Sequence, residues 1–344
     1  MEYGAIDLHT KESEIRIVTA TGEVVLERRV PTRRARLTEV FGGRLRMRIL
    51  LESGTESEWV AQHLEGLGHE VIVADPNYAA MYGDRHRRIK TDRRDVAALA
   101  DANRRGIYRA AHRVSRAQRA VRRHLQVREQ LIRMRTQLIN LLRATLRSEG
   151  LRLRSGAAHT VVVRYAALDV PRALQEALEP VIAMLQGLAP QLAAADAWAR
   201  EAAAGDAITR RLMTAPGVGP ITALHYRAAL DEVSRFRSPG AATSYLGLVP
   251  REDSSGDRHH RGAITKTGPT RPRTMLVQAC WVIWRTPAAG SAALHAWVRR
   301  LAARRGRRVA IIALARRLAR ILFAMWRDGQ DFTAGRRPAA ARAA

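Results

Sequence analysis

The sequence predicts an α/β domain at the N-terminus, a long helical segment in the middle and a mostly α-helical region at the C-terminus. Short β-branched runs separated by turns fill the first part of the chain, which favours a sheet. The segment from Ser115 to Glu149 holds no Gly or Pro, which favours one long helix. In the last third, apolar residues recur mainly at helical spacing.

Strands and helices are expected to alternate in the N-terminal domain. The turn Ala20-Thr21-Gly22 lies between two β-branched runs and is typical of a hairpin. Apolar residues between Trp59 and Leu64 have helical spacing, and Thr91 is expected to cap a helix from about Asp92 to Arg105. The predicted strands are Tyr3–Leu8, Glu14–Thr19, Glu23–Val30, Arg46–Leu51 and Glu70–Ala74. Three antiparallel strands followed by strand, helix, strand and helix is the order of an RNase-H-like, or RuvC-like, fold.

The middle of the chain is predicted to be helical over its whole length. Between Ser115 and Glu149 an apolar stripe keeps a heptad-like spacing, which favours a coiled coil or the arm of a helical bundle. That stripe fits an intramolecular core as well as the seam of a dimer. A second helical stretch, Pro171 to Ala204, contains Pro180 and Pro190 and should kink or divide there. The stripe is formed by Leu131, Met134, Leu138, Leu141 and Thr145.

A third part begins near Asp206. It holds a Pro-Gly-rich turn from Thr214 to Pro220, a helix from Ile221 to Leu230, a polar loop from Arg251 to Thr270 and helices from Arg271 to Trp326. The last residues are of low complexity and are expected to be disordered. We therefore expect domains at residues 1–110, 111–205 and 206–330, followed by a tail at 331–344.

The charge of the chain points to a polyanionic partner. Its 344 residues include 59 Lys and Arg against 32 Asp and Glu, a formal net charge of +27. Nucleic acid fits this charge better than a membrane surface, because no basic amphipathic helix with an aromatic apolar face is evident. The stretch from Arg308 to Trp326 is interrupted by arginines before it could span a bilayer. No secretion signal is visible and the single Cys280 cannot form an internal disulfide, so a cytoplasmic location is expected.

Four carboxylates form the first candidate site. Asp7 lies inside an apolar strand, where a carboxylate is costly unless something neutralises it, although strand alternation could also turn it outward to water. Glu52 ends a strand before Ser53-Gly54, at the position where ligands bind in open α/β sheets. Asp92 and Asp95 lie three apart on one helix face, an arrangement that the helix dipole alone could also favour. Converging carboxylates of this kind can bind a pair of Mg²⁺ ions for phosphodiester chemistry.

Two segments of the C-terminal region form further candidate sites. Gly217 and Gly219 precede a helix, so backbone N–H groups there could bind a DNA phosphate as in a helix-hairpin-helix turn, or the segment could be an ordinary tight turn. Ser254-Ser255-Gly256 lies in a segment crowded with charged residues, and most tripeptides of this kind are only a flexible loop. His259 and His260 are close to it in sequence, but the sequence does not decide which group would activate a serine there.

These residues together resemble the DEDD transposases of bacterial insertion sequences, relatives of the Piv-type DNA invertases. The resemblance covers roughly residues 3 to 290. In the first half it rests on Gly4-Ala5-Ile6-Asp7-Leu8-His9, Leu51-Glu52-Ser53-Gly54 and Lys90-Thr91-Asp92-Arg93-Arg94-Asp95-Val96-Ala97. In the second half it rests on Pro216 to Ala223, Phe236-Arg237-Ser238, Tyr245 to Pro250, Ser254-Ser255-Gly256 and Ile264 to Gly268. Val96 and the missing Gly-Gly-Tyr after Glu52 depart from the family pattern without touching a ligand.

The resemblance implies a transposase or DNA recombinase that cleaves and rejoins strands in two steps. The tetrad Asp7, Glu52, Asp92 and Asp95 would bind two Mg²⁺ ions, for which Mn²⁺ can substitute. Ser255, with Ser254 as the alternative, would attack DNA and form a covalent phosphoserine. Further expected nucleic-acid contacts are Lys90, Gly217, Gly219, Arg258, Arg261, Lys266, Arg271 and Arg273, although a solvated basic loop would explain several of them.

The resemblance also implies partners. Donor and target DNA would be chosen by a structured non-coding guide RNA, often called a bridge RNA, and the metal-binding domain of one subunit would act with the serine domain of another in a dimer or tetramer. The long helix is the expected assembly element, and the location would be the bacterial nucleoid, away from any membrane. Three alternatives stay open: a Holliday-junction-type RuvC-like nuclease, a DNA invertase without an RNA guide, and a nucleic-acid-binding factor with an inactive nuclease fold.

Overall fold

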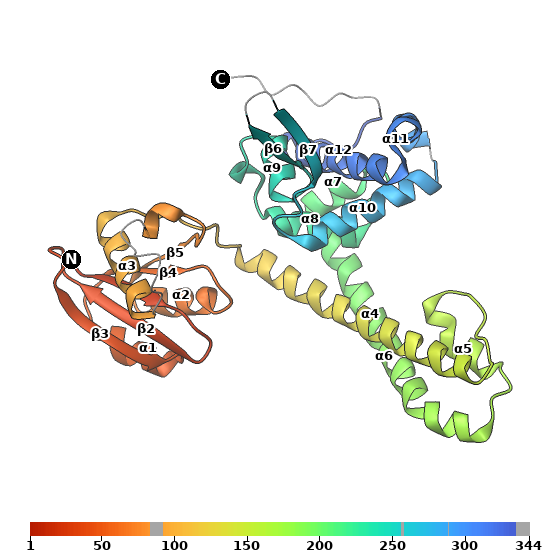
Figure 1. Cartoon of the computed structure of the whole chain (residues 1–344), viewed down its shortest axis with the longest axis horizontal. Helices are drawn as coiled ribbons and strands as arrows, with labels where there is room; N and C mark the ends of the chain where they lie inside the picture. The colour runs from red at the N-terminus through yellow and green to blue at the C-terminus, as the bar shows by residue number, and fades with distance from the viewer. Residues whose placement is uncertain (83–91, 256–257, 288, 335–344) are drawn as a thin grey trace. The chain divides into compact units, whose positions relative to one another are not determined.

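The computed structural model describes residues 1–82, 92–255, 258–287 and 289–334 (Figure 1). The chain divides into two units, Met1–Val114 and Ser115–Ala344. Lys90 and Thr91, a predicted nucleic-acid contact and a predicted helix cap, lie outside the described residues, as do Gly256 and most of the predicted disordered tail.

The first unit is built on a five-stranded mixed sheet with the order β3-β2-β1-β4-β5. β1 pairs antiparallel with β2, and β2 pairs antiparallel with β3. β1 pairs parallel with β4, and β4 pairs parallel with β5. The strands are β1 (Tyr3–Asp7), β2 (Glu12–Val18), β3 (Val24–Pro31), β4 (Arg48–Glu52) and β5 (Glu70–Ala74). All five predicted strands are present, and the α/β character of this unit is confirmed.

Helices cover both faces of this sheet (Figure 1). On one face, α1 (Arg34–Phe41) and α2 (Ser57–Gly66) enclose a core that includes Ile6 and Leu51. On the other face, α3 (Asp92–Arg105) encloses a second core with Ala5 and Leu50. A short 3₁₀ turn, Ala79–Tyr82, packs against α3.

One helix of this unit was not expected from the sequence. The first forty residues predict strands only, but α1 forms at Arg34–Phe41 and buries Leu37, Val40 and Phe41. These residues have the spacing of one helix face. No side chain caps the N-terminus of α1, so the usual start signal is missing.

Two long helices begin the second unit. α4 (Arg116–Ser148) starts at the N-cap Ser115, whose hydroxyl accepts from the backbone N–H of Gln118, and the predicted single helix is confirmed. α6 (Arg172–Gly205) runs alongside it and is continuous, so of the two outcomes predicted at Pro180 and Pro190 a division is wrong, and a kink stays a prediction. Both prolines lie on the exposed side of α6, where water can satisfy the carbonyl groups that lose a partner. The short segments η2 (Ala158–Thr160) and α5 (Val161–Ala166) join the two helices.

The buried stripe of α4 differs from the predicted one. Leu125, Ile139, Leu142 and Leu146 are buried against α5, α6 and α8. In the predicted stripe, Leu141 is 51 % exposed and the other members are half-buried. Ile139, Leu142 and Leu146 each follow a member of the predicted stripe by one residue. The predicted stripe therefore lies beside the intramolecular core of α4 and its side chains stay partly exposed to solvent.

The rest of the second unit is a helical cluster with one β-hairpin (Figure 1). Its core is formed by residues from the helices around the buried α12. β6 (Pro250–Ser255) and β7 (Arg258–Ile264) pair antiparallel where a polar loop was predicted, so that prediction is wrong. The helices are α7 (Ala207–Met213), α8 (Pro220–Leu230), α9 (Pro239–Tyr245), α10 (Thr270–Arg285), α11 (Ala292–Arg305) and α12 (Arg307–Asp328), with 3₁₀ turns at Val233–Arg235 and Ala289–Ser291. Over the residues that the structure describes, no helix combines the length and apolar character needed to cross a membrane.

Candidate functional site

Asp7 and Glu52 end two adjacent parallel strands. In the register of β1 and β4, Ile6 lies opposite Leu51, so the next residue on each strand is one of the two carboxylates. Both therefore lie at the same carboxyl edge of the sheet, where ligands bind in open α/β sheets. Asp7 is the last residue of β1 and Glu52 is the last residue of β4.

Strand alternation directs these two carboxylates to the face that α3 covers. Ile6 and Leu51 belong to the core under α1 and α2, while Ala5 and Leu50 belong to the core under α3. Successive side chains point to opposite faces, so Asp7 shares the face of Ala5. The side chain of Asp7 is only 13 % exposed, which does not fit the alternative that it points outward into water.

The remaining two carboxylates of the tetrad come from the first turn of α3. Asp92 is half-exposed, and Asp95 is buried at 8 % exposure. The buried Asn103 near the end of α3 donates to the carbonyl of Gly4 at 2.8 Å and to the carbonyl of Arg48 at 2.9 Å. Because Gly4 and Arg48 belong to β1 and β4, Asn103 holds α3 against the two strands that carry Asp7 and Glu52.

A second contact anchors the start of α3. Arg93 forms an ion pair with Glu27 on β3, and Glu27 also accepts from Arg16 on β2 at 2.5 Å. These charges lie on the α3 side of the sheet, beside the tetrad. The pairing fixes the first turn of α3, which carries Asp92 and Asp95.

His9 joins the carboxylates, and sequence reasoning did not single it out as a site residue. Its Nε2 lies 3.5 Å from Oδ2 of Asp7 and 3.6 Å from Oδ1 of Asp92. One donor atom from each of these three residues fits within 4.8 Å. The signal was available, because residues two apart on an extended chain face the same side and the spacing Asp-Leu-His follows that rule.

The donor set fits a hard divalent cation. Carboxylate oxygens are the ligands that Mg²⁺ and Mn²⁺ prefer, and imidazole nitrogen is better suited to transition metals than to Mg²⁺. Asp7, Asp92 and His9 offer two oxygens and one nitrogen at a single place. Such a group can bind a cation beside a phosphate.

The predicted serine lies at the tip of the β6–β7 hairpin. Ser255 is the last residue of β6 and is paired in register with Arg258, while Ser254 is paired with His259. The hairpin thus places both serines, the arginine and the histidine at one end of a short two-stranded sheet. Glu252 is paired with Arg261 farther from the tip.

Two glycines with positive φ fix the base of this hairpin. Gly247 has φ +65° and Gly268 has φ +69°, and a Cβ on Gly268 would overlap the carbonyl of Tyr245. A Cβ on Gly247 would overlap the backbone of Thr267. The two motifs that contain these glycines therefore interlock, because only glycine permits both the backbone angle and the close approach.

Arg273 ties the same two segments together from α10. It is buried at 8 % exposure, and its Nη1 donates to the carbonyls of Leu246 and Thr267, each at 2.9 Å. Burial lowers the pKa of its guanidinium. The expectation that Arg273 holds a phosphate does not fit this burial, because its donors are directed at the protein backbone.

Other predicted nucleic-acid contacts are placed differently. Arg271 forms an ion pair with Glu129 on α4. Lys266 is exposed and has a positive φ of 56°, and its N–H donates to the carbonyl of Gly247. Arg258 and Arg261 lie on β7. Lys266 thus keeps its ammonium available at the base of the hairpin, whereas Arg271 has a protein partner.

The Pro-Gly-rich turn lies at the start of α8. Gly217 has φ +74°, Gly219 is the N-cap and Pro220 is the first helical residue. No side chain caps this helix. Its first N–H groups have no acceptor within the helix, which is the condition for an anion-binding N-terminus.

Comparisons with known proteins agree on one group. A transposase model of the DEDD, IS110 type matches residues 5–149, and a model described as the transposase IS116/IS110/IS902 family matches residues 209–295. The first range contains the acidic tetrad, and the second contains the serine hairpin.

Three relatives match over nearly the whole chain. The chain is 30 % identical over 328 residues to a probable family 20 transposase of Pseudomonas aeruginosa, covering 93 % of this chain and 95 % of the relative. It is 25 % identical to the transposase for insertion sequence element IS1111A of Coxiella burnetii, covering 91 % and 86 % of the two chains. It is 27 % identical to the transposase for insertion sequence element IS1328 of Yersinia enterocolitica, covering 95 % and 97 %.

Proposed function

The chain belongs to the IS116/IS110/IS902 family of transposases, which cut and transfer DNA, and we propose that it does so with an acidic metal site and a serine nucleophile. The observation that carries the proposal is the approach of Asp7 and Asp92 to one point at the carboxyl edge of the sheet. The strand order and the position of α3 support an RNase-H-like fold for this unit, in which Glu52 and Asp95 complete the tetrad.

Asp7, Glu52, Asp92 and Asp95 would hold two divalent cations, Mg²⁺ or Mn²⁺. When bound, the cations supply electrostatic stabilisation for the charge that develops on oxygens of the reacting phosphodiester. The chain contributes the arrangement that makes such binding possible. Asn103 and Arg93 hold α3 in place, and the sheet edge presents Asp7 beside Glu52. Carboxylates crowded in this way repel one another until a cation neutralises them.

Ser255 is the proposed nucleophile. The hydroxyl of Ser255 loses its proton and its Oγ forms a bond to phosphorus, while the bond from phosphorus to a deoxyribose oxygen breaks and that oxygen takes up a proton to become a hydroxyl. Rejoining reverses these steps, with the hydroxyl of another strand attacking the phosphoserine. No net hydrolysis occurs, so the strand can be transferred without an external energy source. The rigid base formed by Gly247, Gly268 and Arg273 supports this role, since a nucleophile must be held in place.

Assembly and guidance complete the proposal. We expect domains near 1–110, 111–205 and 206–330, a dimer or tetramer, and choice of donor and target DNA by a structured non-coding RNA at the bacterial nucleoid in the cytoplasm. The partly exposed apolar residues of α4 and α6, including Val127, Leu141 and Met184, support an assembly role as a coiled coil. The net charge of +27 is compatible with two polyanions on one surface.

The test is the capture of a covalent protein–DNA complex. Purified full-length protein is incubated with donor DNA, target DNA, the non-coding RNA of the element and Mg²⁺, and detergent-resistant complexes are counted. Ser255→Ala should abolish the complex, and the matched Ser254→Ala should retain it. Asp7→Asn and removal of the metal with a chelator should both prevent cleavage.

Each other outcome points to an alternative. Cleavage that persists in Ser255→Ala without a covalent complex would indicate a hydrolytic, Holliday-junction-type nuclease. Unchanged recombination without the RNA would indicate an invertase-like enzyme. DNA binding without cleavage in the wild-type protein would indicate a binding factor with an inactive nuclease fold.

A further inference from the structure

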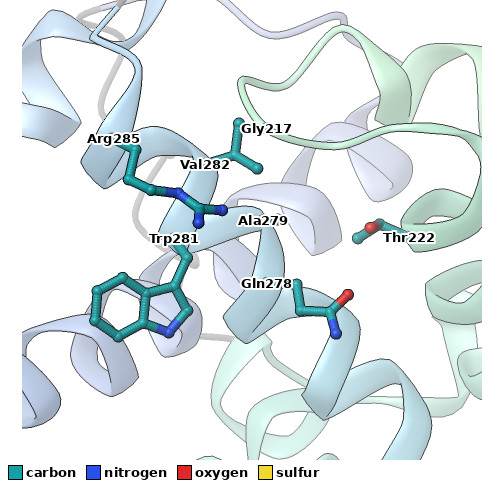
Figure 2. A pocket seen from close by; sticks show the side chains of 7 residues that line it. All are labelled: Gly217, Thr222, Gln278, Ala279, Trp281, Val282 and Arg285. Carbon is teal, nitrogen blue, oxygen red and sulfur yellow. The ribbon is translucent and has the colours of Figure 1, made fainter. Parts of the chain in front are cut away.

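A pocket of about 610 Å³ lies between α10 and the turn that precedes α8 (Figure 2). This volume falls within the range of roughly 300–1,000 Å³ that is usual for small-molecule sites. Gln278, Trp281 and Arg285 stand on one face of α10, because their spacing is that of successive helical turns. Gly217 and Thr222 line the pocket from the opposite side. Apart from Gly217, none of these residues takes part in the function proposed above.

Two groups that line the pocket suit a phosphate. The N–H groups of Ile221 and Thr222 lie in the first turn of α8, where no intrahelical acceptor exists, and the N-cap Gly219 offers no side chain to satisfy them. The helix dipole favours an anion at this point. Arg285 adds a full positive charge from α10, and its guanidinium extends along the pocket (Figure 2). The helix N-terminus and the arginine therefore lie on opposite walls of the pocket, and both favour a negative group in the space between them (Figure 2).

The turn before α8 is fitted closely to α10. A Cβ on Gly217 would lie 2.5 Å from the carbonyl oxygen of Ala279 and 3.1 Å from a side-chain atom of Ile283. Its φ of +74° is also one that other residues rarely adopt. Gly217 is thus required for this packing, which brings the N-terminus of α8 to the α10 face that carries Gln278 and Trp281.

The α10 wall of the pocket suits a nucleobase. The Trp281 indole is half-buried, so the core holds one side of it while part of its surface remains open. Trp284 lies edge-on to Trp281 at 6.5 Å between ring centroids, and Arg307 lies 5.7 Å from the Trp281 ring. Gln278 is exposed and offers both a donor and an acceptor in its carboxamide, the groups that base edges also carry. Aromatic rings beside arginines are the usual platform for single-stranded nucleic acid.

We propose that this pocket binds one unpaired nucleotide of a polynucleotide. The phosphate lies between the N-terminus of α8 and Arg285, the base stacks on Trp281, and Gln278 contacts the edge of the base. A paired base does not fit this arrangement, because its neighbours in the duplex cover both of its faces. The inference rests on DNA as the substrate of the family and is independent of the metal tetrad and of Ser255. DNA and RNA share the required chemistry, and the experiment separates them.

The test compares single-stranded and duplex binding without chemistry. Fluorescence anisotropy is recorded with full-length protein, a chelator, and labelled twelve-nucleotide oligothymidylate, oligouridylate or a blunt DNA hairpin. Trp281→Ala is compared with Trp297→Ala, in which the replaced tryptophan on α11 is also half-buried and also has an arginine, Arg317, over its ring, but does not line the pocket. Trp281→Phe retains a stacking ring. Thermal melting of each variant reports whether it folds.

Trp281→Ala should weaken binding of at least one single strand by about 5- to 150-fold, the range for loss of one stacked base. Trp281→Phe should recover most of the lost affinity, Trp297→Ala should bind single strands nearly as the wild type does, and binding of the duplex should change little in every variant. Arg285→Ala should lower the slope of binding against salt by about one. The strand that loses more affinity identifies DNA or RNA as the ligand.

Two results would overturn the proposal. One is equal binding of single strands by the Trp281→Ala and Trp297→Ala variants. The other is a loss by Trp281→Ala that is as large on the duplex as on the single strands. If Trp281→Ala does not fold, photo-cross-linking of the wild-type protein with 5-iodouracil oligonucleotides decides instead: mass spectrometry should place the adduct on Trp281, and an adduct confined to other residues rejects the pocket. A failed tetrad or serine test would leave all of these measurements unaffected.

Discussion

Replacement of Arg273 by alanine tests whether this residue holds the hairpin or holds a phosphate. In the structure, Nη1 of Arg273 donates to the carbonyls of Leu246 and Thr267 at 2.9 Å, and Nη2 lies 3.4 Å from the hydroxyl of Thr270. Hydrogen bonds from a charged donor contribute about 1.5–3 kcal/mol each. The two short bonds therefore sum to roughly 3–6 kcal/mol before the cost of burying the guanidinium.

That burial cost reduces the expected loss of stability. Burial lowers the pKa of Arg273, so the charged form is disfavoured at this position. We expect Arg273→Ala to lower the free energy of unfolding by about 2–4 kcal/mol, because two buried carbonyls also lose their donor. For a unit of this length, such a loss corresponds to a fall in Tm of roughly 4–16 °C.

The assay combines thermal melting with hydrogen exchange. Exchange should accelerate in the segments 245–248 and 265–268, which Arg273 joins, before it changes elsewhere in the second unit. Lys266→Ala is the matched control, since Lys266 is an exposed cation at the same hairpin base. It should leave Tm nearly unchanged and lower the salt dependence of DNA binding. If Arg273→Ala melts at the wild-type Tm and its DNA binding depends less on salt, Arg273 does not hold the hairpin base and a phosphate contact is favoured instead.

Four further changes test the site and its supports. Asn103→Ala should lower the free energy of unfolding by about 2–4 kcal/mol, because the carbonyls of Gly4 and Arg48 lose their donor. The measurement is a urea titration, and a midpoint equal to that of the wild type would contradict the anchoring of α3 by Asn103. His9→Ala should weaken Mn²⁺ binding by about 10- to 100-fold and leave Tm unchanged. Binding is measured by electron paramagnetic resonance, and an affinity equal to that of the wild type would place His9 outside the site. Burial and the nearby Arg128 on α4 lower the pKa of His225 on α8 to about 4, below its unfolded value of about 6.5. Between these two pH values the unfolded chain binds a proton that the folded chain does not, so the free energy of unfolding should fall by about 3 kcal/mol from pH 6.5 to pH 4. This pH dependence should be absent in His225→Gln. Gly268→Ala should lower the free energy of unfolding by about 2 kcal/mol or more, because Gly268 has a positive φ and its Cβ would overlap the carbonyl of Tyr245, whereas Gly187→Ala, in open space on α6, should not destabilise the protein. Equal Tm values for the two variants would contradict the interlocked base of the hairpin.

The strands of the first unit were predictable because their apolar residues alternate. Ile15 and Ile17 on β2 are buried with a polar residue between them, and β4 is a short apolar run that ends at Glu52. A carboxylate at the end of an apolar strand is also conspicuous in a sequence, so the residues alone were enough to nominate Asp7 and Glu52. A helix beginning at Asp92 was also expected, so the convergence of Asp92 with Asp7 was already a hypothesis from the sequence. The sequence did not add His9 to this cluster, because the approach of a helix to a strand edge depends on tertiary packing and not on local spacing.

The β6–β7 hairpin escaped prediction for the opposite reason. Its strands, Pro250–Ser255 and Arg258–Ile264, are polar and charged and show no apolar alternation, so the residues alone favour a loop. Backbone pairing between the two strands and the interlocked glycines at the base define it instead. The continuous helix α6 is a similar case, because the local rule for Pro180 and Pro190 is overridden by packing of Leu185 and its neighbours against α4.

Both candidate sites depend on a single buried polar side chain that the sequence does not distinguish from its neighbours. Asn103 holds α3 against β1 and β4, and Arg273 holds the base of the hairpin that ends at Ser255. Each donates to two carbonyls from different segments, so its loss frees an element of a candidate site without removing any of the proposed catalytic groups. A variant at either position would therefore lose activity in the same assay as a variant of Asp7 or Ser255. The two classes separate only when stability is measured alongside cleavage: a support residue should lower both together, whereas Asp7→Asn should abolish cleavage in a protein that melts as the wild type does.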